Sequence, residues 1–218
     1  MLVATRFKVR PAAAVLRCAL VALCAGCSAA GSSEKGAVKP TYDPKSGRLT
    51  ELAYDSNHNG TTDTWTEMDG ARPLLTRIDK NEDGRVDRWE YYDNSSRLIK
   101  VGFSRRDDGK PDAWAFAGPD GKTERLEISS TGDPKKIDRW EHYANETLTR
   151  AEEDTNLDGV PDKWESYEAG VVKTASFDEN GDGKPDRRLT YADGVLVAIE
   201  TEPDGSGAFR KRVSVKPK

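Results

Sequence analysis

The segment DKNEDGRVDRWE (79–90) holds the oxygen donors whose spacing has the clearest chemical use. Acidic or amide side chains stand at its first, third, fifth and ninth positions, and a glycine stands at the sixth. Calcium takes about six to eight oxygen ligands, and alternate side chains before a glycine turn can converge on one ion. A main-chain carbonyl at position seven and an acid at position twelve would add to the shell. The expected calcium ligands are Asp79, Asn81, Asp83, the carbonyl of Arg85, Asp87 and Glu90.

The same order of residues recurs in DTNLDGVPDKWE and DENGDGKPDRRL, and in a weaker form in a third segment. The ligands expected in the first are Asp154, Asn156, Asp158, the carbonyl of Val160, Asp162 and Glu165. Those expected in the second are Asp178, Asn180, Asp182, the carbonyl of Lys184 and Asp186, with Leu189 in place of the final acid. The weaker segment offers Asp55, Asn57, Asn59 and Asp63, with Thr66 at position twelve. We therefore expect about three structural calcium sites and a fourth, weaker one.

These segments have an alternative interpretation, because Asp, Asn and Gly are common in turns without any metal. The repeated acid-asparagine-acid-glycine order favours calcium, since clustered carboxylates repel one another unless a cation lies among them. Two related segments lack part of the set: SRRDDGKPD has Arg106 where asparagine belongs, and SSTGDPKKID has lost the first acids. There Arg106 or Lys135 is expected to supply the positive charge that an ion supplies elsewhere.

A repeat of 24 to 26 residues positions these segments along the chain. Its marker is a tryptophan two residues after an aspartate, and all five tryptophans of the protein occupy this place. A sixth copy, KPDRRLTY, has Arg188 instead. The tryptophans are predicted to form the repeat core, as a row on one face of a sheet. They are Trp65, Trp89, Trp114, Trp140 and Trp164.

Each repeat also has a turn signal about half a period after the tryptophan, such as MDGARPLL or ADGVLVAI. A unit therefore consists of a strand, a tight turn, a second strand and an acidic loop, which together fill about 24 residues. This pattern predicts an all-β fold, an antiparallel meander of about six two-stranded hairpin repeats forming one long twisted or curved sheet. The acidic loops would share one rim, about 10 Å apart. The helices that flank an EF-hand loop have no room, so the EF-hand fold is excluded.

The strand between successive tryptophans is expected to place an apolar residue beside them. The candidates are Leu75, Ile99, Leu126, Leu148 and Val172 or their neighbours. A shift of one residue in register exchanges the two faces of a strand, so the sequence leaves this choice open. The aromatic companions of the row are expected to be divided between the two faces. They are Tyr91, Phe116, Tyr143, Tyr167 and Tyr191.

Two families carry partial resemblances to this repeat. The stretch TYDPKSGRLTELAYDSNHNG (41–60) resembles the YD repeats of Rhs-type proteins, which build long curved sheets from antiparallel hairpins. The acidic loops resemble the D-x-N-x-D-G-x-x-D calcium loops of FG-GAP blades, thrombospondin type 3 repeats and dockerins. The resemblances imply hairpin repeats that carry calcium loops, but the period is too short for a four-stranded propeller blade.

The N-terminal 27 residues are predicted to be a secretory signal peptide, because basic residues precede a mostly apolar stretch that ends in small residues. Ala25-Gly26-Cys27 resembles the lipobox of bacterial lipoproteins, which implies lipidation of Cys27. Ser28 rather than Asp follows it, and by that resemblance the outer membrane is favoured. The alternative is a plain cleaved signal with incidental cysteines. Residues 28–39 are expected to form a flexible tether, and residues 40–218 the hairpin-repeat domain.

The composition excludes several classes of function. The net charge is −4 with both signs mixed throughout, so no basic stripe for nucleic acid exists. The two histidines, His58 and His142, stand in no catalytic motif, and we expect no enzyme. The sequence instead suggests a non-enzymatic cell-envelope lipoprotein, structural or adhesive, with calcium-stabilised loops and a protein or glycan partner. The alternative is a carbohydrate- or cell-wall-binding module that uses the repeated aromatic residues, since such modules also consist of aromatic hairpin repeats.

Overall fold

The structure is a computed structural model that describes residues 38–216. The predictions for residues 1–27, with lipidation at Cys27, and for most of the tether lie outside the described residues. Every regular element in the described range is a β-strand, and no helix there is long and apolar enough to cross a membrane. The strands are β1 (Lys39–Tyr42), β2 (Leu49–Tyr54), β3 (Thr64–Asp69), β4 (Arg72–Ile78), β5 (Arg88–Tyr92), β6 (Leu98–Phe103), β7 (Ala113–Ala117), β8 (Thr123–Ile128), β9 (Arg139–Ala144), β10 (Thr147–Glu153), β11 (Lys163–Glu168), β12 (Val171–Phe177), β13 (Arg187–Ala192), β14 (Val195–Pro203) and β15 (Phe209–Ser214).

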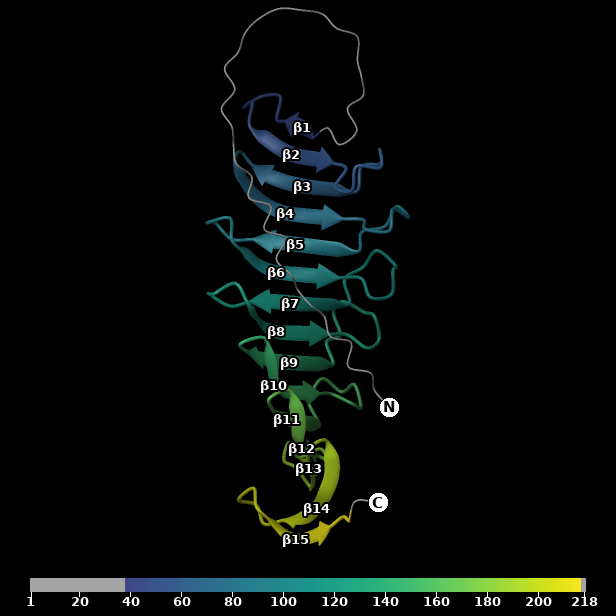
Figure 1. Cartoon of the computed structure of the whole chain (residues 1–218), viewed down its shortest axis with the longest axis vertical. Helices are drawn as coiled ribbons and strands as arrows, with labels where there is room; N and C mark the ends of the chain where they lie inside the picture. Colours follow the sequence, from purple (N-terminus) through teal and green to yellow (C-terminus); the bar gives the residue numbers. More distant parts are fainter. Residues whose placement is uncertain (1–37, 217–218) are drawn as a thin grey trace, which may run out of the picture. The chain divides into compact units, whose positions relative to one another are not determined.

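The 15 strands form one antiparallel sheet in which each strand is hydrogen-bonded to its neighbours in sequence, from β1 to β15 (Figure 1). The sheet stays open, with β1 and β15 as its two edges. The predicted all-β meander of hairpin repeats is therefore confirmed. In Figure 1 the acidic loops after β2, β4, β6 and β8 lie on one side of the sheet, and the tight turns lie on the other.

The tight turns explain why consecutive strands fold back on each other. In three hairpins both central residues have positive φ, which matches the twist of the flanking strands. These pairs are Asn145–Glu146 (φ 49° and 60°), Ala169–Gly170 (49° and 77°) and Asp193–Gly194 (49° and 77°). Each of these hairpins also has a shift in register just beside the turn, so the alternation of side chains restarts there.

The tryptophans lie in one row of directly paired residues on one face, which we name the tryptophan face. The row runs Trp65, Arg77, Trp89, Gly102, Trp114, Glu127, Trp140, Glu152 and Trp164. The residues between the tryptophans are thus charged or glycine, and not the apolar residues that the sequence suggested. Gly102 lies in close packing: a Cβ there would be 3.3 Å from the Cβ of Pro111, which would have to shift slightly, and in ordinary contact with the Trp89 ring at 3.5 Å.

The prediction of the tryptophans as a buried core is correct only for Trp114. That residue is 7% exposed, whereas the other four are half-buried. The physical reason is that the sheet is a single layer, and within residues 38–216 no helix or second sheet covers this face. The tryptophans stay in register along the row, but their rings remain partly exposed because no opposing layer packs on them.

The opposite face, which we name the glutamate face, holds the most buried row of the sheet. Apolar and threonine side chains are interspersed there with three glutamates. The row runs Thr66, Thr76, Glu90, Val101, Ala115, Leu126, Glu141, Ala151, Glu165 and Ala175. Ala151 is 0% and Val101 4% exposed, so the nearest equivalent of a core lies on this face.

Arginine, glutamate and tyrosine side chains form an ionic network on the glutamate face. Arg139 lies 2.8 Å from Glu141 and 3.1 Å from both Glu153 and Glu165. The Tyr143 hydroxyl donates to Glu141 at 2.6 Å. Burial raises the pKa of Tyr143, and the hydrogen bond to Glu141 raises it further. The network stabilises the sheet where no second layer exists.

Candidate metal centre

Six loops on one rim of the sheet hold the candidate ligands, and we number them by their place in the chain. They are loop 1 (55–63), loop 2 (79–87), loop 3 (104–112), loop 4 (129–138), loop 5 (154–162) and loop 6 (178–186). The first residue of each later loop donates its main-chain N–H to the last residue of the loop before it. Examples are Asp79 to the Asp63 carbonyl at 2.9 Å and Asp178 to the Asp162 carbonyl at 2.8 Å. The loops therefore lie side by side, as expected from the meander.

The ligand side chains of loop 2 are held by hydrogen bonds from the main chain of the same loop. Oδ2 of Asp79 accepts the N–H of Gly84 at 2.9 Å, and Oδ1 of Asn81 accepts that of Asp83 at 3.1 Å. Oδ1 of Asp83 accepts the N–H of Arg85 at 2.8 Å. The equivalent bonds recur in loops 1, 5 and 6. The motif thus fixes its oxygen atoms before any ligand is considered.

The last aspartate of each acidic loop closes the loop from the other side. Oδ2 of Asp87 accepts the N–H of Lys80 at 2.7 Å and that of Asn81 at 3.2 Å. Asp162 and Asp186 accept the corresponding N–H groups of loops 5 and 6. The residues predicted at positions one, three, five and nine are therefore brought together in each acidic loop.

One oxygen atom of loop 2 has no hydrogen bond to account for it. Asp79 is only 5% exposed, and its Oδ1 is buried without a hydrogen-bond partner. In residues 38–216 only two other buried side-chain atoms share this condition, Oδ2 of Asp112 and Nε of Arg125. Leaving a buried carboxylate oxygen unsatisfied is costly, and a bound cation would remove that cost. The donor set of loop 2 therefore fits a calcium ion on an observation independent of the motif.

The predicted acids at position twelve lie elsewhere. Glu90 forms a 2.7 Å ion pair with Arg88 and accepts the Tyr92 hydroxyl at 2.8 Å. Glu165 bonds to Arg139 and to Lys163 on the same face. Both glutamates belong to the strands rather than the loops, because position twelve falls after the strand has begun and faces the sheet. We therefore leave Glu90 and Glu165 out of the candidate sites.

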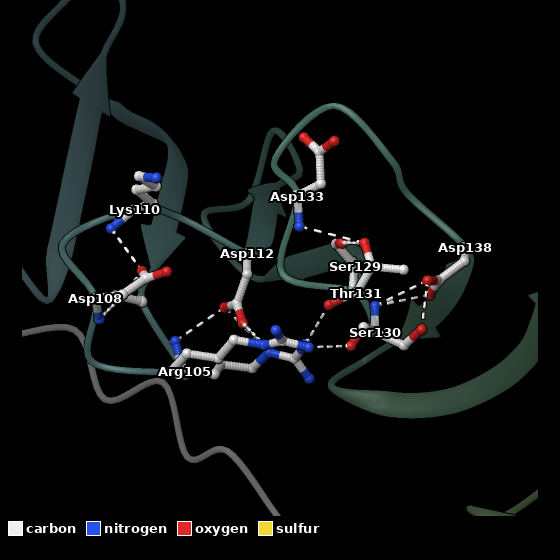
Figure 2. Close-up of polar contacts among 11 residues, drawn as sticks. Arg105, Asp108, Lys110, Asp112, Ser129, Ser130, Thr131, Asp133 and Asp138 are labelled. Carbon is white, nitrogen blue, oxygen red and sulfur yellow. Dashed lines mark hydrogen bonds and ion pairs between the residues drawn. The ribbon is translucent and has the colours of Figure 1, made fainter.

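Two arginines of loop 3 stand where ligands are missing, and Arg106 pairs with Asp112 as predicted. Nε of Arg105 lies 3.2 Å from Oδ1 of Asp112, and Nη2 donates to the Ser129 carbonyl at 2.6 Å. Figure 2 shows this arginine between the two loops, pointing at Asp112 and Ser129. Arg106 also donates to a carbonyl of loop 4, that of Ser130. Two guanidinium groups therefore neutralise Asp112 and join loops 3 and 4.

The contacts between the side chains of one loop and the loop before it were missed in the sequence analysis. The fourth residue of every loop has positive φ, and in loops 2 and 3 it is an acid, Glu82 (60°) and Asp107 (58°). Glu82 accepts the side-chain amides of Asn57 and Asn59 in loop 1. Asp107 accepts the amide of Asn81 in loop 2, at 2.9 and 3.0 Å. An acid at the fourth position, where the other loops have histidine, glycine or leucine, was the available signal.

The carboxyl group of Asp107 lies in a negative environment. Partial loss of solvation raises its pKa and the nearby acids Asp87 and Asp83 raise it further, while the hydrogen bond from Asn81 lowers it. Even so, in residues 38–216 no three carboxylate, imidazole or thiolate groups converge closely enough to form a metal centre unaided. A cation here depends on amide and main-chain oxygens as well.

Comparisons with known proteins give no family for this chain. No protein-family model matches the sequence, and no curated protein matches it. One similar solved structure is that of accessory secretory proteins 1, 2 and 3 in Streptococcus pneumoniae, with 11% identity and a TM-score of 0.37. The similarity covers 53% of this chain and 20% of that chain. A likeness of this size carries no argument about function.

Proposed function

We propose that this protein is a non-enzymatic, lipid-anchored scaffold of the bacterial cell envelope whose sheet is stabilised by calcium along its acidic rim. The observation that carries the proposal is the buried Oδ1 of Asp79, which has no hydrogen-bond partner beneath a loop of further oxygen donors. Calcium is the favoured ion because the donors are carboxylate, amide and carbonyl oxygens without histidine or cysteine.

The candidate sites are those of loops 1, 2, 5 and 6, without an acid at position twelve. In loop 2 the ligands would come from Asp79, Asn81, Asp83, the carbonyl of Arg85 and Asp87. Loops 5 and 6 offer the same donors at the same positions. Loop 1 has Asn59 where the others have aspartate, so its site would be weaker.

Calcium would matter to this sheet because little apolar surface is buried. The buried apolar residues within 38–216 are Val101, Ala113, Trp114, Ala115, Ala151, Ala175 and Ala198. An ion at ten times its dissociation constant adds about 1.4 kcal/mol per site, or about 4 kcal/mol for three sites. That is a large share of the roughly 5 to 15 kcal/mol typical of a folded domain.

A thermal melt tests the calcium part of the proposal. The sample is the chain from residue 27 onward with Cys27→Ser, measured in chelator and then in calcium from about 0.1 to about 10 mM. We expect a rise of several degrees in Tm with calcium and little change with magnesium, because magnesium releases its water ligands reluctantly. The triple variant Asp83→Ala, Asp158→Ala, Asp182→Ala should lose the rise. An unchanged Tm in the parent chain would mean that the loops are only turns.

The envelope part of the proposal rests on the sequence of residues 1–27 and has its own test. Expression of the full chain in a Gram-negative host with a labelled fatty acid is expected to label the protein and place it in the membrane fraction. Cys27→Ser should abolish the label and release the protein. Membrane recovery without label, unchanged by Cys27→Ser, would contradict a lipid anchor.

The half-exposed tryptophan row favours a second candidate function, the binding of a glycan or cell-wall polymer. Four of the five tryptophans remain half-buried on a face that no other described element covers, and aromatic rings of this kind can stack on sugars. A titration with cell-wall fragments, followed by tryptophan fluorescence, tests it. A saturable change in emission that Trp140→Ala weakens would support glycan binding, and a flat titration would remove it.

A further inference from the structure

We propose that the calcium site of loop 2 is shared between two repeats, with Asp107 of loop 3 supplying a ligand to the ion. This inference rests on the proposed function and goes beyond it, because the motif of loop 2 contains no residue of loop 3. Its consequence is that calcium at loop 2 joins neighbouring repeats as well as ordering one loop.

The position of the Asp107 carboxylate carries the inference. Both of its oxygen atoms lie within hydrogen-bond distance of Nδ2 of Asn81, at 2.9 and 3.0 Å. Asn81 is the third residue of the loop 2 motif, and its Oδ1 accepts the N–H of Asp83, the fifth residue. The Asp107 carboxylate therefore lies beside the ligand set of loop 2. Clustered carboxylates repel one another unless a cation lies among them.

Loop 2 also shows an independent need for a cation. Oδ1 of Asp79 is buried and unpartnered, while Oδ2 of the same carboxylate accepts the N–H of Gly84 at the turn of the loop. That bond directs the carboxylate beneath the loop. The acid expected at position twelve, Glu90, is engaged with Arg88 and Tyr92 on the sheet. The shell therefore needs an oxygen from another source, and Asp107 offers it.

Contacts with loop 2 hold Asp107 in this position. Its φ of 58° is in the left-handed region, as at the fourth residue of the other loops. Nη1 of Arg85 in loop 2 donates a hydrogen bond to the Asp107 carbonyl at 3.0 Å, which holds the main chain of Asp107 against loop 2. Arg85 also lies close to Gly109, where a Cβ would be 3.4 Å from the Arg85 Cβ. The carboxylate is thus placed before an ion binds.

The other junctions give internal comparisons. Loop 6 offers no carboxylate to loop 5 at the position of Asp107, because the fourth residue of loop 6 is Gly181. Loop 4 has Gly132 at that place, and the guanidinium of Arg106 occupies the space beside it. A cation at the junction of loops 2 and 3 would therefore do what arginine does at the next junction. The loop 2 site should also bind calcium more tightly than the loop 5 site.

Calcium titration calorimetry tests the inference. The sample is the chain from residue 27 with Cys27→Ser. It also carries Asp158→Ala and Asp182→Ala, so that loop 2 is the only loop with the full motif. Adding Asp107→Asn is expected to weaken the tighter site about tenfold, because one charged ligand is lost. The matched control is Asp193→Asn at a tight turn, which makes the same charge change at an exposed residue of positive φ and should leave affinity within about twofold.

A second variant tests whether an added acid raises the calcium affinity of loop 5. In a background of Asp83→Ala and Asp182→Ala, Gly181→Asp places an acid at the equivalent of Asp107, where a Cβ meets nothing within 4 Å. We expect calcium to bind several-fold more tightly than in the same background with Gly181→Asn.

The outcomes separate the two proposals. Calcium binding that neither Asp107→Asn nor Gly181→Asp alters would overturn the shared site and leave the proposed function standing. No calcium binding by the parent chain would overturn both. Circular dichroism of each variant in chelator checks that a change in affinity does not reflect unfolding.

Discussion

The guanidinium of Arg105 lies against the carboxylate of Asp112, with Nε 3.2 Å from Oδ1, and the Asp112 side chain is only 2% exposed. The main-chain N–H of Arg105 donates to the same oxygen at 2.9 Å. At the centre of the acidic rim the chain thus supplies its own cations. The loops on either side retain their acids, so the response of the rim to calcium should be uneven along the sheet.

Arg105→Ala is expected to destabilise the sheet by about 2 kcal/mol, because it removes the main partner of a buried carboxylate and a bond to the Ser129 carbonyl. Urea unfolding measures the loss, which should be the same in calcium and in chelator. The control is Arg97→Ala at a tight turn, where the arginine side chain is 65% exposed in its pair with Asp93. A surface pair of this kind contributes little, so an equal loss in the control would contradict the assignment.

Gly132→Ala and Gly181→Ala form a matched pair at the fourth position of loops 4 and 6. Both glycines have left-handed φ, 81° and 79°. A Cβ at 132 would lie 2.6 Å from Cζ of Arg106, whereas a Cβ at 181 meets nothing within 4 Å. Gly181→Ala is expected to cost about 1 kcal/mol from the backbone alone, and Gly132→Ala about 2 kcal/mol, because Arg106 must also move and lose its bond to the Ser130 carbonyl. Equal costs in urea unfolding would show that Arg106 yields freely to the added methyl group.

Trp114→Ala is expected to destabilise the protein about twice as much as Trp164→Ala, with losses of about 3 and 1.5 kcal/mol. Trp114 is 7% exposed and lies between Gly102 and Glu127 in the row, while Trp164 is half-buried. Urea unfolding followed by far-UV circular dichroism compares the two variants. Acrylamide should quench Trp164 more than Trp114 in chains that retain a single tryptophan, and the reverse order would contradict the burial described above.

The stability of the sheet is expected to fall as the pH drops below about 6.5, the ordinary value for histidine. Burial lowers the pKa of His142, and the charge of Arg150, whose Nη2 lies 3.2 Å from Nε2, lowers it further. The unfolded chain therefore binds more protons between the lowered pKa and 6.5, so this contribution is complete above 6.5 and is lost on acidification through that window.

Tm values at pH 5.5 and 7.5 measure the effect of His142. The drop in Tm between the two values should be smaller in His142→Gln than in the parent chain. His58→Gln provides the control, because it removes the other histidine of the sequence. If both variants keep the full drop, carboxylates alone cause it.

The plan of the fold could be predicted because each connection is marked by residues with a specific backbone requirement. Asp193–Gly194 has positive φ at both places, and the glycine at the sixth position of loop 2, Gly84, has φ of 88°. It was harder to predict on which face of the sheet each side chain lies. A register shift between Tyr91 and Tyr92, and its counterparts in other hairpins, restarts the alternation beside each tight turn. Leu126 consequently lies on the glutamate face instead of between two tryptophans.

The candidate metal residues could be predicted within each loop and not between loops. The motif specifies oxygen atoms along one stretch of chain, and the structure brings these together by local hydrogen bonds such as Asp83 with Arg85. Asp107 contacts Asn81 across a separation of 26 residues, which no single-loop pattern describes. Glu90 was misplaced for the opposite reason, since the pattern counts twelve positions along a loop that here ends in a strand.

Within residues 38–216 the main chain of each strand pairs only with the strands next to it in sequence. A mechanical load applied to the two edge strands would therefore pass through the hydrogen-bonded pairs one after another, and only side-chain ion pairs such as Arg139–Glu165 reach past a neighbouring strand. Such a sheet is expected to extend by peeling, strand by strand, at low force. The Arg105 and Arg106 bonds between loops 3 and 4 are places where this peeling should pause, and so is any ion held jointly by loops 2 and 3.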